Sequence, residues 1–198
     1  MIVWTIQSRH AWRELQATRH LRATPISIEP LFTSAYQWMI QQMTQRIGPP
    51  PSSETFPLWA WYQWKSSGQR QPDVRATGHL PKGTYAVRLT CELADSRVLL
   101  SDFDGWHYVL NNWYLPQSEQ DAMLFDQVVD SDTKFIATPM QSYPCYVRSQ
   151  VIRSWERIFD LDWIDSYVTQ PKEQKAIQAT FWELHDEDVL AVKEFVAR

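Results

Sequence analysis

The chain has 198 residues, of which 44% are hydrophobic, and it carries a formal net charge of −4 at pH 7. That length and apolar content suit one domain, which we expect to cover residues 1–198. The acidic balance argues against a protein that coats nucleic acid through a large basic surface. No stretch of 18 apolar residues is present, so we expect no transmembrane helix and no membrane partner.

Three further features of the sequence bear on location and on binding. Residues 1–10 lack the basic region, the long apolar stretch and the cleavage site of a signal peptide. Cys91 and Cys145 form no CxxC pair, which favours reduced thiols in a cytoplasmic protein. The chain also holds 11 tryptophans, and this side chain serves cores, stacking pockets and interfaces alike. We expect most of them in the core and a few around a flat ring.

The first quarter of the chain predicts a strand followed by two helices. Residues 2–7 (IVWTIQ) are rich in β-formers, and the helix expected after them is capped by Ser8. The clearest helix covers Ser34–Ile47, with Ser34 as its N-cap and Gly48 at its end. Its apolar stripe consists of Tyr36, Met39, Ile40, Met43 and Ile47.

The middle of the chain predicts two strands separated by a long loop. Residues 56–64 (FPLWAWYQW) form an aromatic strand, and residues 65–83 are rich in Gly, Pro and polar side chains. Residues 84–93 (TYAVRLTCEL) alternate between apolar and polar side chains, as in a half-buried antiparallel strand. The apolar face of that strand consists of Tyr85, Val87, Leu89, Cys91 and Leu93.

The second half of the chain mixes helices and strands irregularly. The expected elements are a helix with the stripe Trp106, Val109, Leu110 and Trp113, an acidic helix from Ser118, a small strand over 134–139, an amphipathic helix over 147–159, a strand over 176–184 and a terminal helix from Asp186 to Phe195. This irregular order predicts an α+β fold with a mostly antiparallel sheet flanked by helices.

The segment Leu99–Leu115 (LLSDFDGWHYVLNNWYL) crowds two carboxylates and a histidine into six residues. Ser101 or Asp102 is placed to cap the helix that follows, and Asp104 falls in its first turn, where the helix dipole favours an acid. His107 faces a different side of that helix from the apolar stripe. Capping is therefore the favoured interpretation of these two aspartates.

Two functional alternatives remain for the same segment. An apolar strand followed by Asp-x-Asp-Gly resembles the phosphatase motif of the haloacid dehalogenase superfamily, in which the first Asp attacks phosphorus. The usual continuation of that motif and its downstream pair of aspartates are missing here. Asp102, Asp104 and His107 also offer oxygen and nitrogen ligands for a metal ion.

Glu183 is the more interesting acid of the chain. In the strand expected over 176–184, Glu183 continues the face formed by Ile177, Ala179 and Phe181. Such a carboxylate lies either in water at a frayed strand end or in a cleft. In a cleft its pKa would be raised, which suits a catalytic role. Glu183 is therefore the candidate catalytic residue.

Other polar and aromatic side chains are candidates for a binding pocket. Thr5 and Gln7 share a face of the first strand, where they are either satisfied hydrogen-bonding groups of the core or donors into a pocket. Trp59 and Trp61 share a face of the second strand, and they either belong to the core or clamp a flat ring. Arg46 lies at a helix end, where it favours the dipole or binds phosphate.

Several segments spread over nearly the whole chain resemble a bacterial family catalogued as domain of unknown function 3841. These segments are WTIQ (4–7), YQWMIQQM (36–43) with Arg46 nearby, PLWAWYQW (57–64), LLSDFDGWHYVLN (99–111) and IQATFWEL (177–184). That family name implies no activity.

The order of the elements more distantly resembles the ADP-ribosyltransferase fold, which has a split, mostly antiparallel sheet. In that fold an early strand contacts the NAD ribose, a second strand lies near the nicotinamide, and a late strand carries the catalytic Glu. The resemblance assigns Thr5 and Gln7 to the first role, Trp59 and Trp61 to the second, and Glu183 to the third. The usual early His or Arg is absent from WTIQ, and Phe181 stands where a Gln or Glu is expected.

The resemblance implies that NAD is a substrate and that ADP-ribose is transferred to a protein or nucleic-acid acceptor. Arg46 and His107 are further candidate NAD contacts. A toxin or phage-defence role, with an antitoxin or another protein as partner, fits small transferases of this kind. The alternative is a module that binds a nucleotide or a partner in an aromatic cleft without chemistry.

Overall fold

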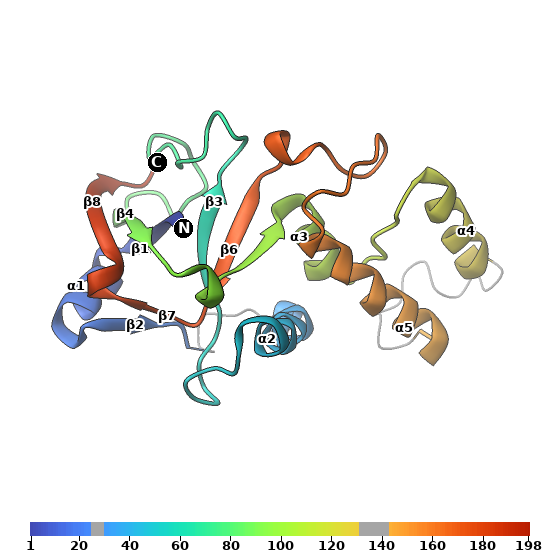
Figure 1. Ribbon diagram of the computed structural model, residues 1–198, viewed down its shortest axis with the longest axis horizontal. Coiled ribbons are helices and arrows are strands. Elements are labelled where there is room, and N and C mark those ends of the chain that lie inside the picture. The colour runs from blue at the N-terminus through green and yellow to red at the C-terminus, as the bar shows by residue number, and fades with distance from the viewer. Residues whose placement is uncertain (25–29, 131–142) are drawn as a thin grey trace. The chain divides into compact units, whose positions relative to one another are not determined.

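The computed structural model describes residues 1–24, 30–130 and 143–198. Figure 1 shows a main sheet in the order β5-β6-β3-β1-β4-β8 and a second sheet of β2 and β7. The strands are β1 (Ile2–Ser8), β2 (His20–Arg22), β3 (Leu58–Gln63), β4 (Tyr85–Glu92), β5 (Leu99–Asp102), β6 (Ile177–Phe181), β7 (Glu183–His185) and β8 (Val189–Val196). The helices are α1 (Arg9–Thr18), α2 (Thr33–Ile47), α3 (Phe103–Leu110), α4 (Glu119–Asp130) and α5 (Cys145–Ser154).

These elements confirm the α+β class. Within the main sheet, β1 pairs with β3 and β4, β3 pairs with β6, and β4 pairs with β8, all antiparallel. The chain divides into two compact units, which are residues 1–100 with 176–198 (unit 1) and residues 101–175 (unit 2). The single domain expected over residues 1–198 stays a prediction.

Unit 1 begins with a strand that passes directly into a helix. Ser8 ends β1, and its Oγ accepts a hydrogen bond of 3.1 Å from the backbone N–H of Ala11, so the predicted N-cap is confirmed. α1 then buries Leu15 and ends at Arg19, whose φ of +69° is left-handed. The backbone N–H of Arg19 donates to the carbonyl of Leu15 at 2.8 Å, which closes the last turn.

Helix α2 lies where the sequence predicts it, but its start and its buried face differ. A short 3-10 helix over Pro30–Phe32 precedes it, so α2 begins at Thr33 and the predicted cap Ser34 lies inside the helix. Gly48, with φ of +94°, stands at its C-cap as expected. The buried residues of α2 are Ala35, Trp38, Met39, Gln42 and Met43.

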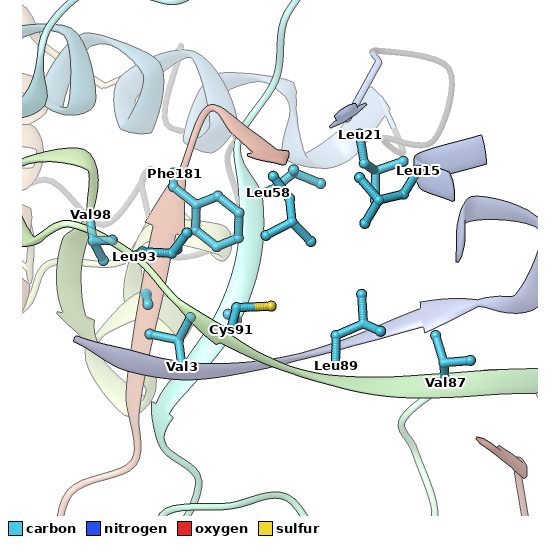
Figure 2. Close-up of a cluster of buried hydrophobic side chains, with 13 residues drawn as sticks. Val3, Leu15, Leu21, Leu58, Val87, Leu89, Cys91, Leu93, Val98 and Phe181 are labelled. Carbon is cyan, nitrogen blue, oxygen red and sulfur yellow. The ribbon is translucent and has the colours of Figure 1, made fainter. Parts of the chain in front are cut away.

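The core of unit 1 lies on one face of the main sheet. Figure 2 shows Leu15 of α1 and Leu21 of β2 pointing toward Leu58 and Leu89 of the sheet. The alternation expected along 84–93 is confirmed by the buried side chains of β4, except that Tyr85 is exposed at the strand end. The core cluster consists of Val3, Leu15, Leu21, Leu58, Ala60, Val87, Leu89, Cys91, Leu93, Val98, Ala179, Phe181 and Leu184.

The C-terminal segment is a strand, so the helix expected from Asp186 to Phe195 is wrong. A short 3-10 helix over Asp186–Asp188 leads into β8, which pairs with β4 from Tyr85 to Cys91. The helix propensity of Ala, Lys and Glu in this segment is outweighed by the backbone hydrogen bonds that pair it with a whole neighbouring strand.

The strand expected over 176–184 is interrupted at Trp182. β6 ends at Phe181, and β7 begins at Glu183 and pairs with β2 in the second sheet. The indole N–H of Trp182 donates to the carbonyl of Gly48 at 2.9 Å, which fixes the break. Glu183 therefore does not continue the face of Ala179 and Phe181.

Unit 2 is built mainly from helices. α4 starts after Ser118, whose Oγ accepts from the backbone N–H of Asp121, and this confirms the expected acidic helix. α5 continues into a 3-10 helix over Trp155–Phe159. α3 ends at Leu110, so Trp113 lies beyond the helix and is exposed, and its place in the predicted apolar stripe is wrong. The small strand expected over 134–139 lies outside the described residues. Among the described helices, none has both the length and the hydrophobicity to cross a bilayer.

Candidate functional site

A pocket of about 220 Å³ lies in unit 1 where β1 and β3 part from each other. The two strands are paired at Trp4 and Trp61. Further along, a side-chain bond links them, because the Oγ1 of Thr5 donates to the carbonyl of Trp59 at 2.8 Å. The pocket is lined by Ile6, Gln7, Ala23, Thr24, Tyr36, Phe56, Pro57, Leu58 and Trp59.

The structure brings three of the predicted binding residues together at this pocket. Gln7 and Trp59 line it. Thr5 is buried behind them and bonds to both, since it donates to the Trp59 carbonyl and accepts from the Nε2 of Gln7 at 2.8 Å. Of the two interpretations of Thr5, the satisfied hydrogen-bonding group of the core is the one seen here.

Aromatic side chains form one wall of the pocket. The ring centroid of Tyr36 lies 6.1 Å from that of Trp59, nearly edge-on, and 6.5 Å from that of Phe56. Burial raises the pKa of the Tyr36 hydroxyl, although a hydrogen bond with Trp59 acts in the opposite direction. Tyr36 therefore stays neutral at physiological pH. A wall of this kind suits a flat ring.

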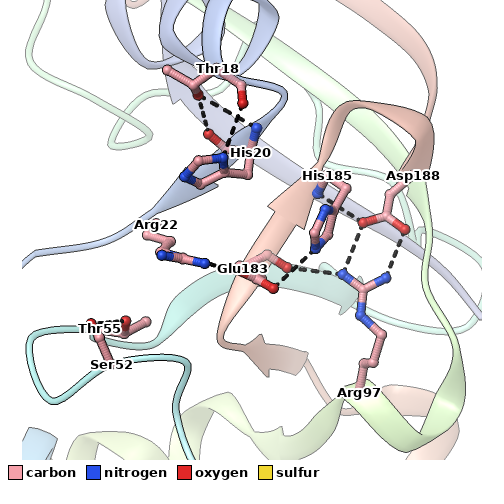
Figure 3. Close-up of polar contacts among 9 residues, drawn as sticks. All are labelled: Thr18, His20, Arg22, Ser52, Thr55, Arg97, Glu183, His185 and Asp188. Carbon is pink, nitrogen blue, oxygen red and sulfur yellow. Dashed lines mark hydrogen bonds and ion pairs between the residues drawn. The ribbon is translucent and has the colours of Figure 1, made fainter.

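Glu183 does not line this pocket but lies beside its wall. It faces Arg22 across the β2–β7 pair, and the next residue, Ala23, lines the pocket. Figure 3 shows the Glu183 carboxylate between Arg22 and His185. Arg22 Nε lies 2.8 Å and Nη2 2.7 Å from Glu183 Oε2, and His185 Nε2 lies 3.1 Å from Oε1.

The charge state of Glu183 differs from the sequence-based expectation of a raised pKa. Burial of the carboxyl raises its pKa, but hydrogen bonds from Arg22 and His185 together outweigh burial, and the pKa is lowered. Glu183 is therefore an ionised, partnered carboxylate at neutral pH. That state suits the stabilisation of a positive charge and does not suit a proton donor.

A second basic residue fixes the backbone at Glu183. Arg97 donates through Nη2 to the Glu183 carbonyl at 3.1 Å, and it forms a fork with the carboxylate of Asp188 at 2.8 and 3.0 Å. Asp188 in turn accepts from the backbone N–H of His185 at 2.9 Å. Figure 3 shows this chain of bonds around the β6–β7 break. The break that carries Glu183 is thus held in one geometry.

Sequence reasoning missed Arg22, Arg97 and His185 as neighbours of Glu183. The resemblance places its early basic residue within WTIQ, whereas Arg22 comes from the short strand β2. Arg22 and Glu183 are 161 residues apart in the chain, and no local pattern predicts their pairing. The sequence signal that was available is HLR (20–22), a short alternating segment directly after α1.

The remaining predicted NAD contacts lie elsewhere. Trp61 faces Trp4 on β1 and Gln178 on β6, inside the paired part of the sheet. Arg46 donates to Gln42 within α2 at 3.2 Å. His107 belongs to unit 2, where its Nδ1 lies 2.9 Å from the carbonyl of Phe103. None of these side chains lines the aromatic pocket.

In unit 2, the capping interpretation of the Asp-x-Asp-Gly segment is confirmed. The Oδ1 of Asp102 accepts from the backbone N–H groups of Asp104 and Gly105 at 2.9 and 3.3 Å. Its Oδ2 accepts from Thr169 at 3.1 Å and lies 3.6 Å from the Nζ of the buried Lys175. The carboxylate is thus fully engaged in holding the start of α3.

Asp104 and Gly105 also have structural explanations within unit 2. Burial and the neighbouring Asp102 raise the pKa of Asp104, and His107 opposes them. A Cβ at position 105 would lie 2.9 Å from the Cγ2 of Ile158, so only glycine fits the packing there. Within the described part of the chain, no group of three His, Cys, Asp or Glu side chains is arranged to hold a metal ion.

The family model for a domain of unknown function (DUF3841) matches residues 2–190 of the chain. Since this match covers most of the sequence, the protein belongs to that family. No curated protein and no solved structure matches the chain. The family assignment brings no activity with it, so the function has to be argued from the pocket and its neighbours.

Proposed function

We propose that this protein is ADP-ribosyltransferase-like. In this proposal the aromatic pocket binds the nicotinamide end of NAD, and ADP-ribose is transferred to a protein or nucleic-acid acceptor. The observation that carries the proposal is the pocket itself. It lies where β1 and β3 part and brings Gln7 and Trp59 into one cavity.

The arrangement of the strands supports this proposal. The resemblance requires an early, a second and a late strand around one cleft. β1, β3 and β6 are neighbours in the order β6-β3-β1 (Figure 1). Leu58, which lines the pocket, pairs with Phe181, only two residues before Glu183. Residues far apart in the sequence thereby meet at one end of the sheet.

The size of the pocket supports binding of part of the dinucleotide. Pockets for drug-sized ligands measure roughly 300 to 1,000 Å³, whereas this one measures about 220 Å³. A pyridine ring with its neighbouring ribose is the portion of NAD that suits such a volume. The wall of Tyr36, Phe56 and Trp59 offers apolar faces and edges to that ring.

The proposed reaction breaks the bond between ribose C1′ and the pyridinium nitrogen. Nicotinamide leaves as a neutral molecule with the bonding electron pair, and positive charge develops on the ribose. The acceptor forms a new bond to C1′ and loses a proton to solvent. Glu183 contributes a fixed negative charge that stabilises the oxocarbenium-like transition state, a task that needs an ionised carboxylate.

A second candidate function is a module that binds a nucleotide without chemistry. One observation favours it, namely that Arg22 and His185 already occupy both oxygens of the Glu183 carboxylate. Arg22 also offsets its negative charge. In this alternative the pocket keeps its ligand and Glu183 stabilises the β2–β7 pair only.

The two functions are separated by measuring binding and nicotinamide release on the same samples. NAD at millimolar concentration is added in a thermal-shift assay, and nicotinamide is quantified over time for the wild type and for Glu183→Gln. Glu187→Gln is the matched control, because Glu187 is exposed and lies four residues further along the chain. We expect a thermal shift in all three proteins.

Nicotinamide release is expected from the wild type and from Glu187→Gln, with a loss of about a hundredfold or more in Glu183→Gln, as when one preorganised electrostatic group is removed. A thermal shift without release from any protein would favour the binding module. The absence of a shift with NAD would refute both functions for this ligand.

A further inference from the structure

The hydrogen bonds behind the aromatic pocket run in one direction only. The Trp59 carbonyl can only accept, so the single hydroxyl proton of Thr5 must be donated to it. The Thr5 oxygen can then only accept from Gln7. This order fixes the Gln7 amide with its nitrogen toward Thr5, because the opposite orientation would set two acceptors against each other.

One atom of Gln7 is left with no partner by this relay. Nε2 donates one of its two N–H groups to Thr5 and leaves the other unused. Oε1 receives no hydrogen bond within the described part of the chain. Gln7 lines the pocket and is only partly exposed. The side-chain amide of this pocket-lining residue therefore keeps one carbonyl acceptor and one N–H donor that no hydrogen bond of the described residues uses.

We infer that Gln7 recognises the substituent of the bound pyridine ring and selects a carboxamide over a carboxylate or a ketone. The inference rests on the proposed function and specifies its substrate as NAD and not the deamidated dinucleotide. A carboxamide has one carbonyl and one NH₂ group, so it complements both atoms of Gln7. A carboxylate has acceptors only, and it would face Oε1 without a proton between them.

Thr5 is a positioning residue in this inference. It is 1% exposed and bonds to β3 as well as to Gln7. Without its hydroxyl the Gln7 amide would be able to turn over and present its NH₂ group to a carboxylate. The selectivity thus depends on a buried hydroxyl that does not line the pocket itself.

The test compares three dinucleotides that differ only in the ring substituent. These are NAD, its 3-acetylpyridine analogue and nicotinic acid adenine dinucleotide. The acetyl substituent of the analogue is uncharged but has no N–H donor. Dissociation constants are measured by calorimetry or by ligand-observed NMR. The acetyl analogue separates the loss of a donor from the effect of charge.

For the wild type we expect binding weaker by about tenfold for the acetyl analogue, as for one lost hydrogen bond, and weaker still for the acid. In Gln7→Met, which keeps the side-chain length, NAD and the acetyl analogue should bind equally. Thr5→Val should lose selectivity against the acid, and Thr5→Ser, which keeps the hydroxyl, should retain it. Thermal melting of each variant checks that it is folded.

The outcomes distinguish the inference from the function on which it rests. If all three dinucleotides bind the wild type equally, the inference is wrong and NAD binding stands. If the acid binds more tightly than NAD, the assigned orientation of Gln7 is wrong. If no dinucleotide binds, the proposed function fails and the inference falls with it.

Discussion

Each unit of this protein contains an ion pair that involves a residue singled out by sequence analysis, and the two pairs differ in environment. In unit 2, the side chains of Lys175 and Asp102 are 2% and 10% exposed. In unit 1, those of Arg22 and Glu183 are 40% and 22% exposed. The first pair is closed to solvent and bonded to the backbone of its own unit. The second stands beside a pocket and keeps contact with water.

The difference teaches that crowding of charged residues in the sequence is a poor guide to chemistry. The segment around Asp102 looks catalytic because its acids are adjacent, yet Asp102 is committed to α3, Thr169 and Lys175. Glu183 begins the charged segment 183–188 and contacts His185 within it, but its ion-pair partner Arg22 comes from β2, 161 residues away. We expect the buried pair to govern stability and the exposed pair to govern function.

The largest expected effect on stability is that of Asp102→Ala. This substitution removes the N-cap of α3 and leaves Lys175 buried without its carboxylate. Breaking a buried pair in this way costs about 3 to 5 kcal/mol. The change in the free energy of unfolding is measured by urea denaturation, provided that the m-value is the same for the wild type and the variant. Asp104→Ala is the matched control, since residue 104 is exposed overall although its carboxyl is partly desolvated, and about 0.5 kcal/mol or less is expected there.

A loss for Asp102→Ala no larger than that of its control would show that the pair is not buried as described. The double variant Asp102→Ala with Lys175→Met sharpens the point. Because the double variant removes both charges together, its loss of unfolding free energy should be smaller than the sum of the losses in the two single variants.

A smaller loss is expected for Gly105→Ala in the same segment. The new methyl group would lie 2.9 Å from the Cγ2 of Ile158, which is fully buried, so that side chain would have to shift within the core. Overpacking of this kind costs about 1 to 3 kcal/mol, and the better helix propensity of alanine recovers up to about 1 kcal/mol. Gly68→Ala is the control, because the nearest atom there lies at 3.9 Å. Equal melting temperatures for the two variants would contradict the packing.

Much of the local structure follows from short-range signals. Ser8 caps α1, Gly48 ends α2, and the alternation along β4 marks its buried face. Each of these depends on neighbours within a few residues, so the sequence contains the information. The Asp102 cap was predictable for the same reason, because its bond partners are two and three residues away.

The features that sequence reasoning missed depend on long-range pairing. The edge strand β8 has helix-forming residues and becomes a strand only because β4 offers its free edge. The break at Trp182 depends on a bond to Gly48, 134 residues away. That break moves Glu183 into the second sheet, next to Arg22. Periodicity in the sequence therefore does not predict the pairing of Glu183 with Arg22.

The smallest expected effect on stability is that of Glu183→Gln. Partly exposed ion pairs contribute about 0 to 1 kcal/mol, so we expect a loss in that range at pH 7. The folded-state pKa of Glu183 is lowered, so its contribution is present above the ordinary value of 4.5 and disappears as the pH falls through the folded pKa. The difference in unfolding free energy between the wild type and the variant at pH 7 should therefore shrink as the pH is lowered below 4.5. A loss at pH 7 as large as that of Asp102→Ala would mean that Glu183 serves the fold, and its assignment to chemistry would have to be withdrawn.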